Sequence, residues 1–256
     1  MKKNIPVIML LFLFVLALSA CGLLQAPEEA SAPIEAIPLQ TDSTETVVAT
    51  EEPEAIATEV VDAAETEMEP EVVEAPAGEL RIYQITPGES TVRFELDEDL
   101  RGTRITVVGT TDQVAGELAI NLADLATAQV GVMQINARTL LTDNDFRNRA
   151  IQNRILETGA YEFITFTPTA VSGLPASAGV GDQVTFTIEG ELTIRDITQP
   201  ATFTVVTTAV SETQLTGTAS TTIMRADYDL NIPSVQNVAN VEEEVELYID
   251  FVANGS

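Results

Sequence analysis

The sequence predicts an all-β domain, either a closed antiparallel barrel or a large two-sheet sandwich. Across residues 79–256, apolar side chains alternate with polar ones, which is the period of a half-buried strand. Several of these runs need about 10 to 12 residues, against about 5 to 6 for an ordinary strand. Long antiparallel strands with one apolar face suit both architectures. One stretch of the domain predicts a helix.

The predicted strands share a composition as well as a period. Threonine and valine dominate them, which suits a pleated surface. Phe186, Ile188 and Leu192, for example, share one face of a single run. Clusters of Gly, Pro, Asp and Ser such as 172–182 separate the runs. In chain order the alternating runs are 90–96, 113–122, 128–137, 162–171, 184–194, 201–210, 213–226 and 245–251.

The predicted helix covers about residues 143–158. Thr142 or Asp143 can cap its start, because either side chain can accept a hydrogen bond from a free backbone N–H. Gly159 is placed to end it, because glycine readily adopts the left-handed conformation that closes many helices.

The arginines of this helix are sorted by its turn of about 100° per residue. Arg147 and Arg154 fall in the middle of the apolar face, whereas Arg149 points away. A buried unpaired charge is very costly, so the two inward arginines need anionic partners. A carboxylate of the domain, Asp227 or Asp196, and an anionic group of a bound ligand both meet this need, and the sequence leaves the two open.

The N-terminus has the layout of an export signal. Lys2 and Lys3 precede an apolar run over 5–17, and small residues lead up to Cys21. The stretch "LSAC" that ends at Cys21 resembles the lipobox of bacterial lipoproteins. That resemblance implies removal of residues 1–20 and lipidation of Cys21. The alternative is an uncleaved membrane anchor with a free thiol, and both interpretations place the bulk of the chain outside the cytoplasm.

An acidic linker is predicted between Cys21 and the domain, over residues 21–78. Residues 22–78 hold 15 acids and no Lys or Arg, and no aromatic residue. Such a stretch has too little apolar material to offset its ordering entropy, so we expect it to be disordered and to act as a spacer. The folded barrel is then expected over 79–256.

Composition removes several function classes. The chain has no His, and Cys21 is its only Cys, so His-based triads and the common zinc sites are absent. The formal net charge of −28 repels nucleic acid. Carboxylates remain available, but they scatter over turns and strand faces without a recognisable pair. We therefore expect no catalytic residues, no metal and no enzymatic activity.

Three segments together resemble the YceI-like family. They are "INARTLLTDNDFRNRAIQNRILETGAYEFITF", "EGELTIRDITQPATFTV" and "TIMRADYDLNIP", and their order and spacing agree over nearly all of 79–256. The chain departs from the family pattern at Asn148, Glu162 and Asp229. The positions that align with the family motifs are Thr142, Arg147, Asn148, Ile164, Thr165, Phe166, Gly190, Leu192, Thr193, Ile194, Arg225, Asp227 and Tyr228.

The resemblance implies a lipocalin-like antiparallel β-barrel of about eight strands, with one helix near its mouth and a long isoprenoid or similar amphiphile inside. Each methylene buried in such an interior contributes about 0.8 kcal/mol, so a long chain needs few other contacts. The alternative is that the same side chains fill the barrel as ordinary core. The candidate lipid-binding residues are Phe94, Ile164, Phe166, Phe186, Ile188, Leu192, Phe203, Val205 and Ile223, and the candidate head-group or mouth residues are Arg147, Arg154, Arg225 and Asp227.

The sequence therefore predicts an extracytoplasmic binding protein, anchored to the cell membrane through lipidated Cys21. It would hold an isoprenoid-type lipid for transport, storage or sequestration, with no other cofactor, and a homodimer is compatible with the sequence. The alternative is a non-catalytic β-domain with a filled core, displayed on a stalk for protein–protein interaction.

Overall fold

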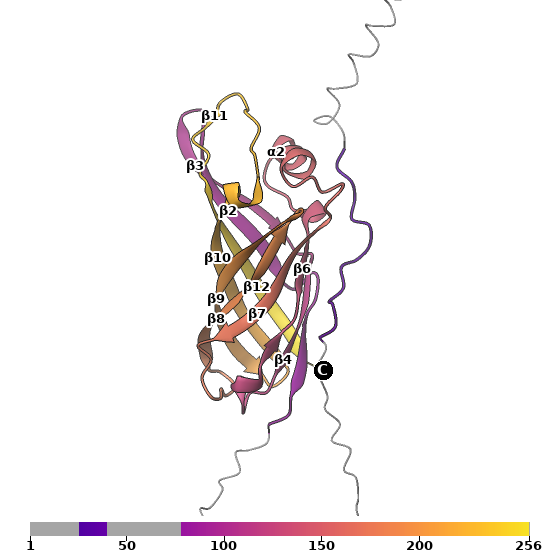
Figure 1. Ribbon diagram of the computed structural model, residues 1–256, viewed down its shortest axis with the longest axis vertical. Coiled ribbons are helices and arrows are strands. Elements are labelled where there is room, and N and C mark those ends of the chain that lie inside the picture. The colour runs from indigo at the N-terminus through magenta and orange to yellow at the C-terminus, as the bar shows by residue number, and fades with distance from the viewer. Residues whose placement is uncertain (1–25, 40–77, 256) are drawn as a thin grey trace, which may run out of the picture.

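The computed structural model describes residues 26–39 and 78–255 and shows a closed antiparallel barrel (Figure 1). Eight strands form the ring in the order β1-β4-β6-β7-β8-β9-β10-β12, and pairing of β12 with β1 closes it. The barrel prediction is confirmed and the sandwich alternative is wrong. The strands are β1 Arg81–Ile85, β2 Thr91–Leu100, β3 Thr103–Thr111, β4 Val114–Ile120, β5 Gln129–Val130, β6 Met133–Asn136, β7 Phe163–Ser172, β8 Gln183–Ile194, β9 Ile197–Ser211, β10 Gln214–Met224, β11 Val238–Ala239 and β12 Glu244–Gly255.

Strand β2 leaves the ring and extends one end of the barrel. It pairs with β12 over Thr91–Glu95 and with β3 over Val92–Leu100. Arg101 and Gly102 join β2 to β3, both with positive φ, which is the backbone of the tight hairpin turn that matches strand twist. The β2–β3 hairpin, the helix α2 and the segment before β12 lie at the same end of the molecule (Figure 1). This end is called the mouth.

The predicted alternation is confirmed in the strands that line the barrel. On β9, Phe203 and Val205 are buried while Thr202 and Thr204 are exposed. The buried apolar residues of the ring strands form one cluster inside the barrel. The hydrophobic faces of the strands therefore meet each other in the interior, and Thr202 and Thr204 face solvent.

The predicted helix exists, but it starts later than expected. Helix α2 spans Asp145–Ala150, and the Asn144 side chain accepts hydrogen bonds from the N–H groups of Phe146 and Arg147. The prediction of Thr142 or Asp143 as the cap is wrong. Thr142 instead donates its backbone N–H and its hydroxyl to Oδ1 of Asn148, so it fixes the loop that leads into the helix.

The second half of the predicted helix is a wider turn. Residues Ile151–Ile155 are π-helical, and the N–H of Leu156 donates to the carbonyl of Ile151 at 2.7 Å. The left-handed residue just beyond this turn is Glu157, with φ of 49°, and not the predicted Gly159. The wider turn rotates every later side chain away from its place on an ideal α-helix.

Residues 26–39 lie along the outside of the barrel as an extended strap (Figure 1). Ser31 donates from both its N–H and its hydroxyl to the carboxylate of Glu162, at 2.8 and 2.6 Å. Ile34 is only 5% exposed, and the N–H of Leu39 donates to Glu117 at 2.7 Å. Near the mouth, Arg138 binds both the carbonyl of Glu29 and the carboxylate of Glu28.

The strap corrects part of the linker prediction. Composition predicted one disordered spacer over 21–78, yet 26–39 is docked through specific hydrogen bonds and a buried apolar side chain. Residues 1–25 and 40–77, including the predicted signal peptide, the lipidation site Cys21 and the rest of the linker, lie outside the described residues.

Docking of the strap is expected to weaken in acid. Burial raises the pKa of Glu162, but hydrogen bonds from Ser31 and Asn136 and the charge of Arg138 outweigh it and hold the pKa below the ordinary 4.5. A carboxyl whose pKa is lower in the docked state stabilises docking above that ordinary value. This contribution is lost as the pH falls through the lowered pKa.

Hydrogen exchange of peptides from 26–39, corrected for the intrinsic effect of pH, measures this loss. Protection is expected at neutral pH and should decline below about pH 4.5. In Glu162→Gln, protection should be weak at every pH. Equal protection of the native strap on both sides of pH 4.5 would contradict the role given to Glu162.

Candidate functional site

The described residues enclose two chambers inside the barrel. The larger one, about 560 Å³, lies at the mouth, where Phe146, Arg147 and Ile151 of the helical segment form part of its wall. The smaller one, about 110 Å³, lies deeper and is lined almost entirely by apolar side chains. The volume of the larger chamber falls in the range of pockets that hold small molecules, about 300 to 1,000 Å³.

All nine residues predicted to contact lipid line a chamber. Phe166 and Phe203 line both. Those that line the larger chamber alone are Phe94, Ile164, Leu192 and Ile223. Those that line the smaller chamber alone are Phe186, Ile188 and Val205. The structure thus places every predicted lining residue inside the barrel, while their contact with a ligand stays a prediction.

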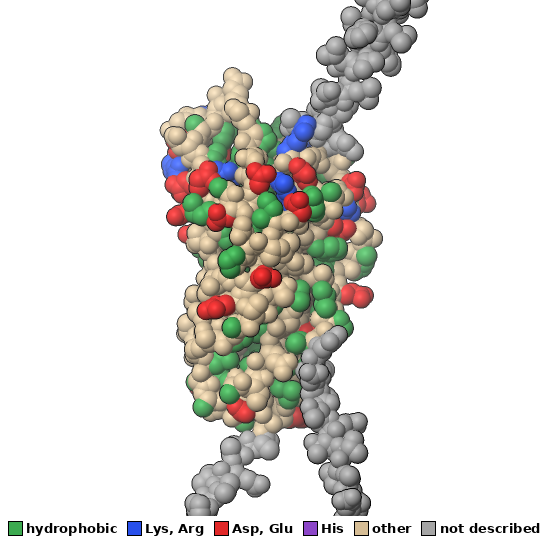
Figure 2. Space-filling view, in the orientation of Figure 1, with side chains coloured by type: hydrophobic (Ala, Val, Ile, Leu, Met, Phe, Trp, Pro, Cys, Tyr) green, Lys and Arg blue, Asp and Glu red, His purple; other side chains and the backbone are tan. Residues whose placement is uncertain are grey.

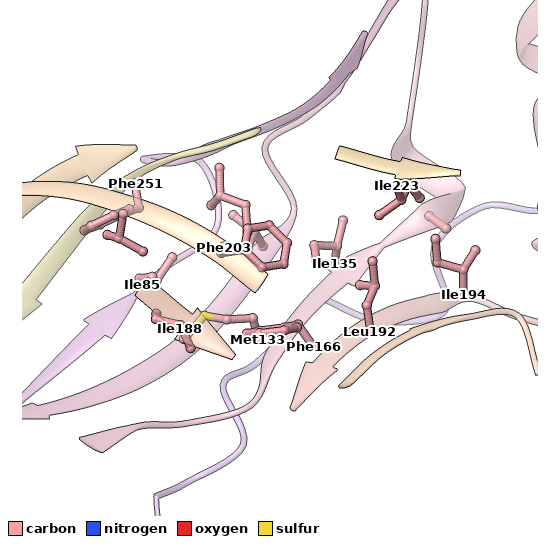
Figure 3. Close-up of a cluster of buried hydrophobic side chains, with 14 of the residues drawn as sticks. Ile85, Met133, Ile135, Phe166, Ile188, Leu192, Ile194, Phe203, Ile223 and Phe251 are labelled. Carbon is pink, nitrogen blue, oxygen red and sulfur yellow. The ribbon is translucent and has the colours of Figure 1, made fainter. Parts of the chain in front are cut away.

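Phe166 and Phe203 lie where the two chambers meet. Their ring centroids are 4.8 Å apart with an interplanar angle of 64°, an edge-to-face pair worth about 0.5 to 1.5 kcal/mol beyond its burial. In Figure 3 the two rings lie between Ile188 on one side and Ile194 on the other. Ile249 of β12 is the third residue common to both chambers.

Arg147 lies at the rim of the larger chamber and is held by two carboxylates. Its guanidinium is 3.0 Å from Oε1 of Glu98 and 2.6 Å from Oδ1 of Asp143. Glu98 is 6% exposed, so this is a nearly buried ion pair. The predicted need for an anionic partner is confirmed, but the partners are not the expected Asp227 or Asp196.

Arg225 and Arg93 also line the larger chamber and are also paired. Arg225 contacts the carboxylate of Glu243 at 2.6 Å and donates to the carbonyls of Glu242 and Leu230. Arg93 contacts Glu95 and Asp250, and its guanidinium lies 4.0 Å from the centre of the Tyr248 ring.

Charged side chains gather near the mouth on the face shown in Figure 2, and few lie toward the other end. Each of the three arginines that line the larger chamber is already neutralised by acids of the protein. A hydrogen bond to Glu95 and the neighbouring acids raise the pKa of Arg93.

Arg154 and Asp227 are not part of this rim. Both are exposed, and neither lines a chamber. The prediction that Arg154 points inward is wrong, because it assumed 100° per residue across the π-helical turn. Asp227 lies two residues after Arg225 on the short 3-10 turn Arg225–Tyr228. The next residue, Tyr228, is buried, which raises the pKa of its hydroxyl to about 12 and keeps it neutral.

A family comparison agrees with this architecture. The family model described as YceI-like domain matches residues 83–253, which is most of the chain. The match omits only the first two residues of β1 and the last two of β12 among the barrel strands. The chain belongs to the YceI-like family. No curated protein matches it in sequence.

Two solved structures show the same fold as this YceI-like chain. A polyisoprenoid binding domain from Saccharophagus degradans, implicated in plant cell wall breakdown, is 16% identical with a TM-score of 0.54, and the match covers 70% of this chain and all of that domain. BcnA of Burkholderia cenocepacia is 18% identical with a TM-score of 0.51, and the match covers 64% of this chain and 96% of BcnA.

Glu98, the buried partner of Arg147 in this YceI-like barrel, was not predicted from the sequence. Glu98 shares the inward face of β2 with Phe94 and Leu96, at the same two-residue spacing. An acid in register with an apolar face was the signal that could have found it. Within the described ranges, no group of three or more acids is placed to hold a metal ion, and no helix is long and apolar enough to cross a bilayer.

Proposed function

We propose that the protein is a membrane-tethered carrier that holds an isoprenoid or similar amphiphile in the larger chamber. The observation that carries this proposal is a chamber of about 560 Å³ lined mostly by apolar side chains. Such a chamber shelters a hydrocarbon chain from water, and each buried methylene contributes about 0.8 kcal/mol. Family membership supports the same function, since the related domain from Saccharophagus degradans is named for polyisoprenoid binding.

The rim favours a head group without charge. Arg147, Arg225 and Arg93 are each bound to carboxylates, so an anionic head group would have to displace one of these acids. Displacement would leave Glu98 buried without its cation, which costs several kcal/mol. Hydroxyl or carbonyl groups can instead accept hydrogen bonds from the guanidinium groups without breaking a pair.

The tether belongs to the same proposal. Cys21 would carry the lipid anchor and keep the barrel outside the cytoplasm, beside the membrane from which its ligand comes. Binding and release would need no covalent chemistry, so the lipid would be exchanged and not transformed.

Mass spectrometry of an organic extract tests the proposal. The protein is purified without residues 1–21, which removes the anchor and retains every described residue, from a bacterial host that makes isoprenoids with and without charged head groups. One long-chain isoprenoid per protein, without a phosphate, is the expected result. A diphosphate-bearing isoprenoid would overturn the head-group assignment alone. An empty extract, with no uptake of added isoprenoids by the folded protein, would overturn lipid binding and leave the interaction-domain alternative.

A further inference from the structure

We propose that Phe166 and Phe203 form a septum that sets the length of isoprenoid chain accepted by the barrel. This inference rests on the proposed function, because it assumes that the chain enters the larger chamber from the mouth. Among the described residues, the two chambers share only Phe166, Phe203 and Ile249. A chain that fills the larger chamber therefore meets these side chains before it reaches the smaller one.

The septum is built from strands that are not neighbours. Phe166 lies on β7 and Phe203 on β9, with β8 between them. The β8 position between them is Gly190, which is buried among the inward-facing residues of that strand. A Cβ at Gly190 would lie 2.6 Å from the Phe166 ring. The missing side chain lets the two rings meet over the backbone of β8, at 4.8 Å between centroids.

The septum closes the path with side chains and not with backbone. Phe166 and Phe203 are each 4% exposed, and each lines both chambers. Beyond the two rings, the smaller chamber is also lined by apolar side chains, including Ile188, Val205 and Phe251. Removing one ring is therefore expected to join two apolar spaces into one longer channel. The chain length accepted by the barrel should then increase.

A competition experiment reads chain length directly. The protein lacking residues 1–21 is incubated with phosphatidylcholine vesicles that carry an equal mixture of linear isoprenoid alcohols of increasing length. The bound alcohols are then extracted and quantified by mass spectrometry. In the native protein, occupancy should rise with each added isoprene unit up to a limiting length, because a longer chain fills more of the chamber and contacts more of its wall. Beyond that length it should level off or fall.

Phe166→Ala and Phe203→Ala are expected to move the limit to longer chains. If either alanine variant fails to fold, Phe166→Leu and Phe203→Leu keep an apolar side chain and should move the limit in the same direction by less. Phe163→Ala is the matched control, because it removes a ring from the same strand as Phe166 at a position that is 36% exposed and lines neither chamber. It should leave the limit unchanged.

The outcomes separate this inference from the proposed function. Binding by the native protein with a limit that the septum variants do not move would overturn the septum alone. Occupancy that keeps rising with length in the native protein would do the same. Absence of bound alcohol at every length would overturn the proposed function and the septum with it.

Discussion

Replacing Leu247 with glutamate is expected to abolish isoprenoid binding while the barrel stays folded. Leu247 lies on β12 opposite Phe94 of β2, and both side chains line the larger chamber. Leu247 is only partly buried, so a carboxylate there is hydrated while the chamber is empty. A bound hydrocarbon chain would strip that water from an unpaired charge, which costs several kcal/mol. Affinity should fall by on the order of 100-fold or more, since each 1.4 kcal/mol is tenfold.

The matched control is Val210→Glu, which adds the same side chain at a position 49% exposed on β9. It should bind as much lipid as the native protein. Bound isoprenoid in the organic extract is the readout, and far-ultraviolet circular dichroism checks the fold. Native levels of lipid in folded Leu247→Glu would mean that the chain does not occupy the larger chamber.

Replacing Arg147 with alanine is expected to lower the free energy of unfolding by about 3 kcal/mol. The change leaves the carboxylate of Glu98, 6% exposed and 3.0 Å from the guanidinium, without its only described hydrogen-bond partner. A buried charge that loses its partner is far costlier than a surface pair that is broken. Urea denaturation followed by circular dichroism gives the difference directly.

The same guanidinium supplies the control. Asp143, its other partner, has a side chain that is 88% exposed, so Asp143→Ala should cost no more than about 0.5 kcal/mol. Adding Glu98→Gln to Arg147→Ala should recover much of the loss, because the buried charge is then gone. Similar costs for Arg147→Ala and Asp143→Ala would show that Glu98 is hydrated at the rim, and the preference for an uncharged head group would lose its main support.

The sequence predicted the interior of the barrel better than its mouth. Strand alternation identified the inward face correctly for all nine lining candidates, because side chains in a strand point to fixed sides. Alternation does not indicate which inward residues of different strands lie at the same height along the barrel axis. The meeting of Phe166 and Phe203 depends on the pairing of β7 with β8 and of β8 with β9, so the septum was not predictable from the pattern.

The mouth depends on irregular backbone and on contacts between distant segments. Arg154 was misplaced because nothing in the local sequence marked the π-helical turn. The Glu98 partner of Arg147 is 49 residues away in the chain and could be paired with it only once the strands were placed. The strap was not predicted because residues 22–78 are acidic as a whole. Within them, Ser31 donates a hydrogen bond to Glu162 and Ile34 is buried, and composition indicates neither contact.

The docked strap also changes what the acidic stretch can do. Residues 40–77 run from Leu39 to Gly78, and both ends of that stretch are fixed to the same barrel. Because Leu39 is already held on the barrel, residues 40–77 add nothing to the length of chain between Cys21 and the barrel. If Cys21 carries the proposed lipid, five residue steps from Cys21 to Ala26 separate the bilayer from the strap, and they span at most about 18 Å. Because the strap begins beside Arg138 at the mouth, so short a segment would hold the opening of the barrel close to the lipid surface.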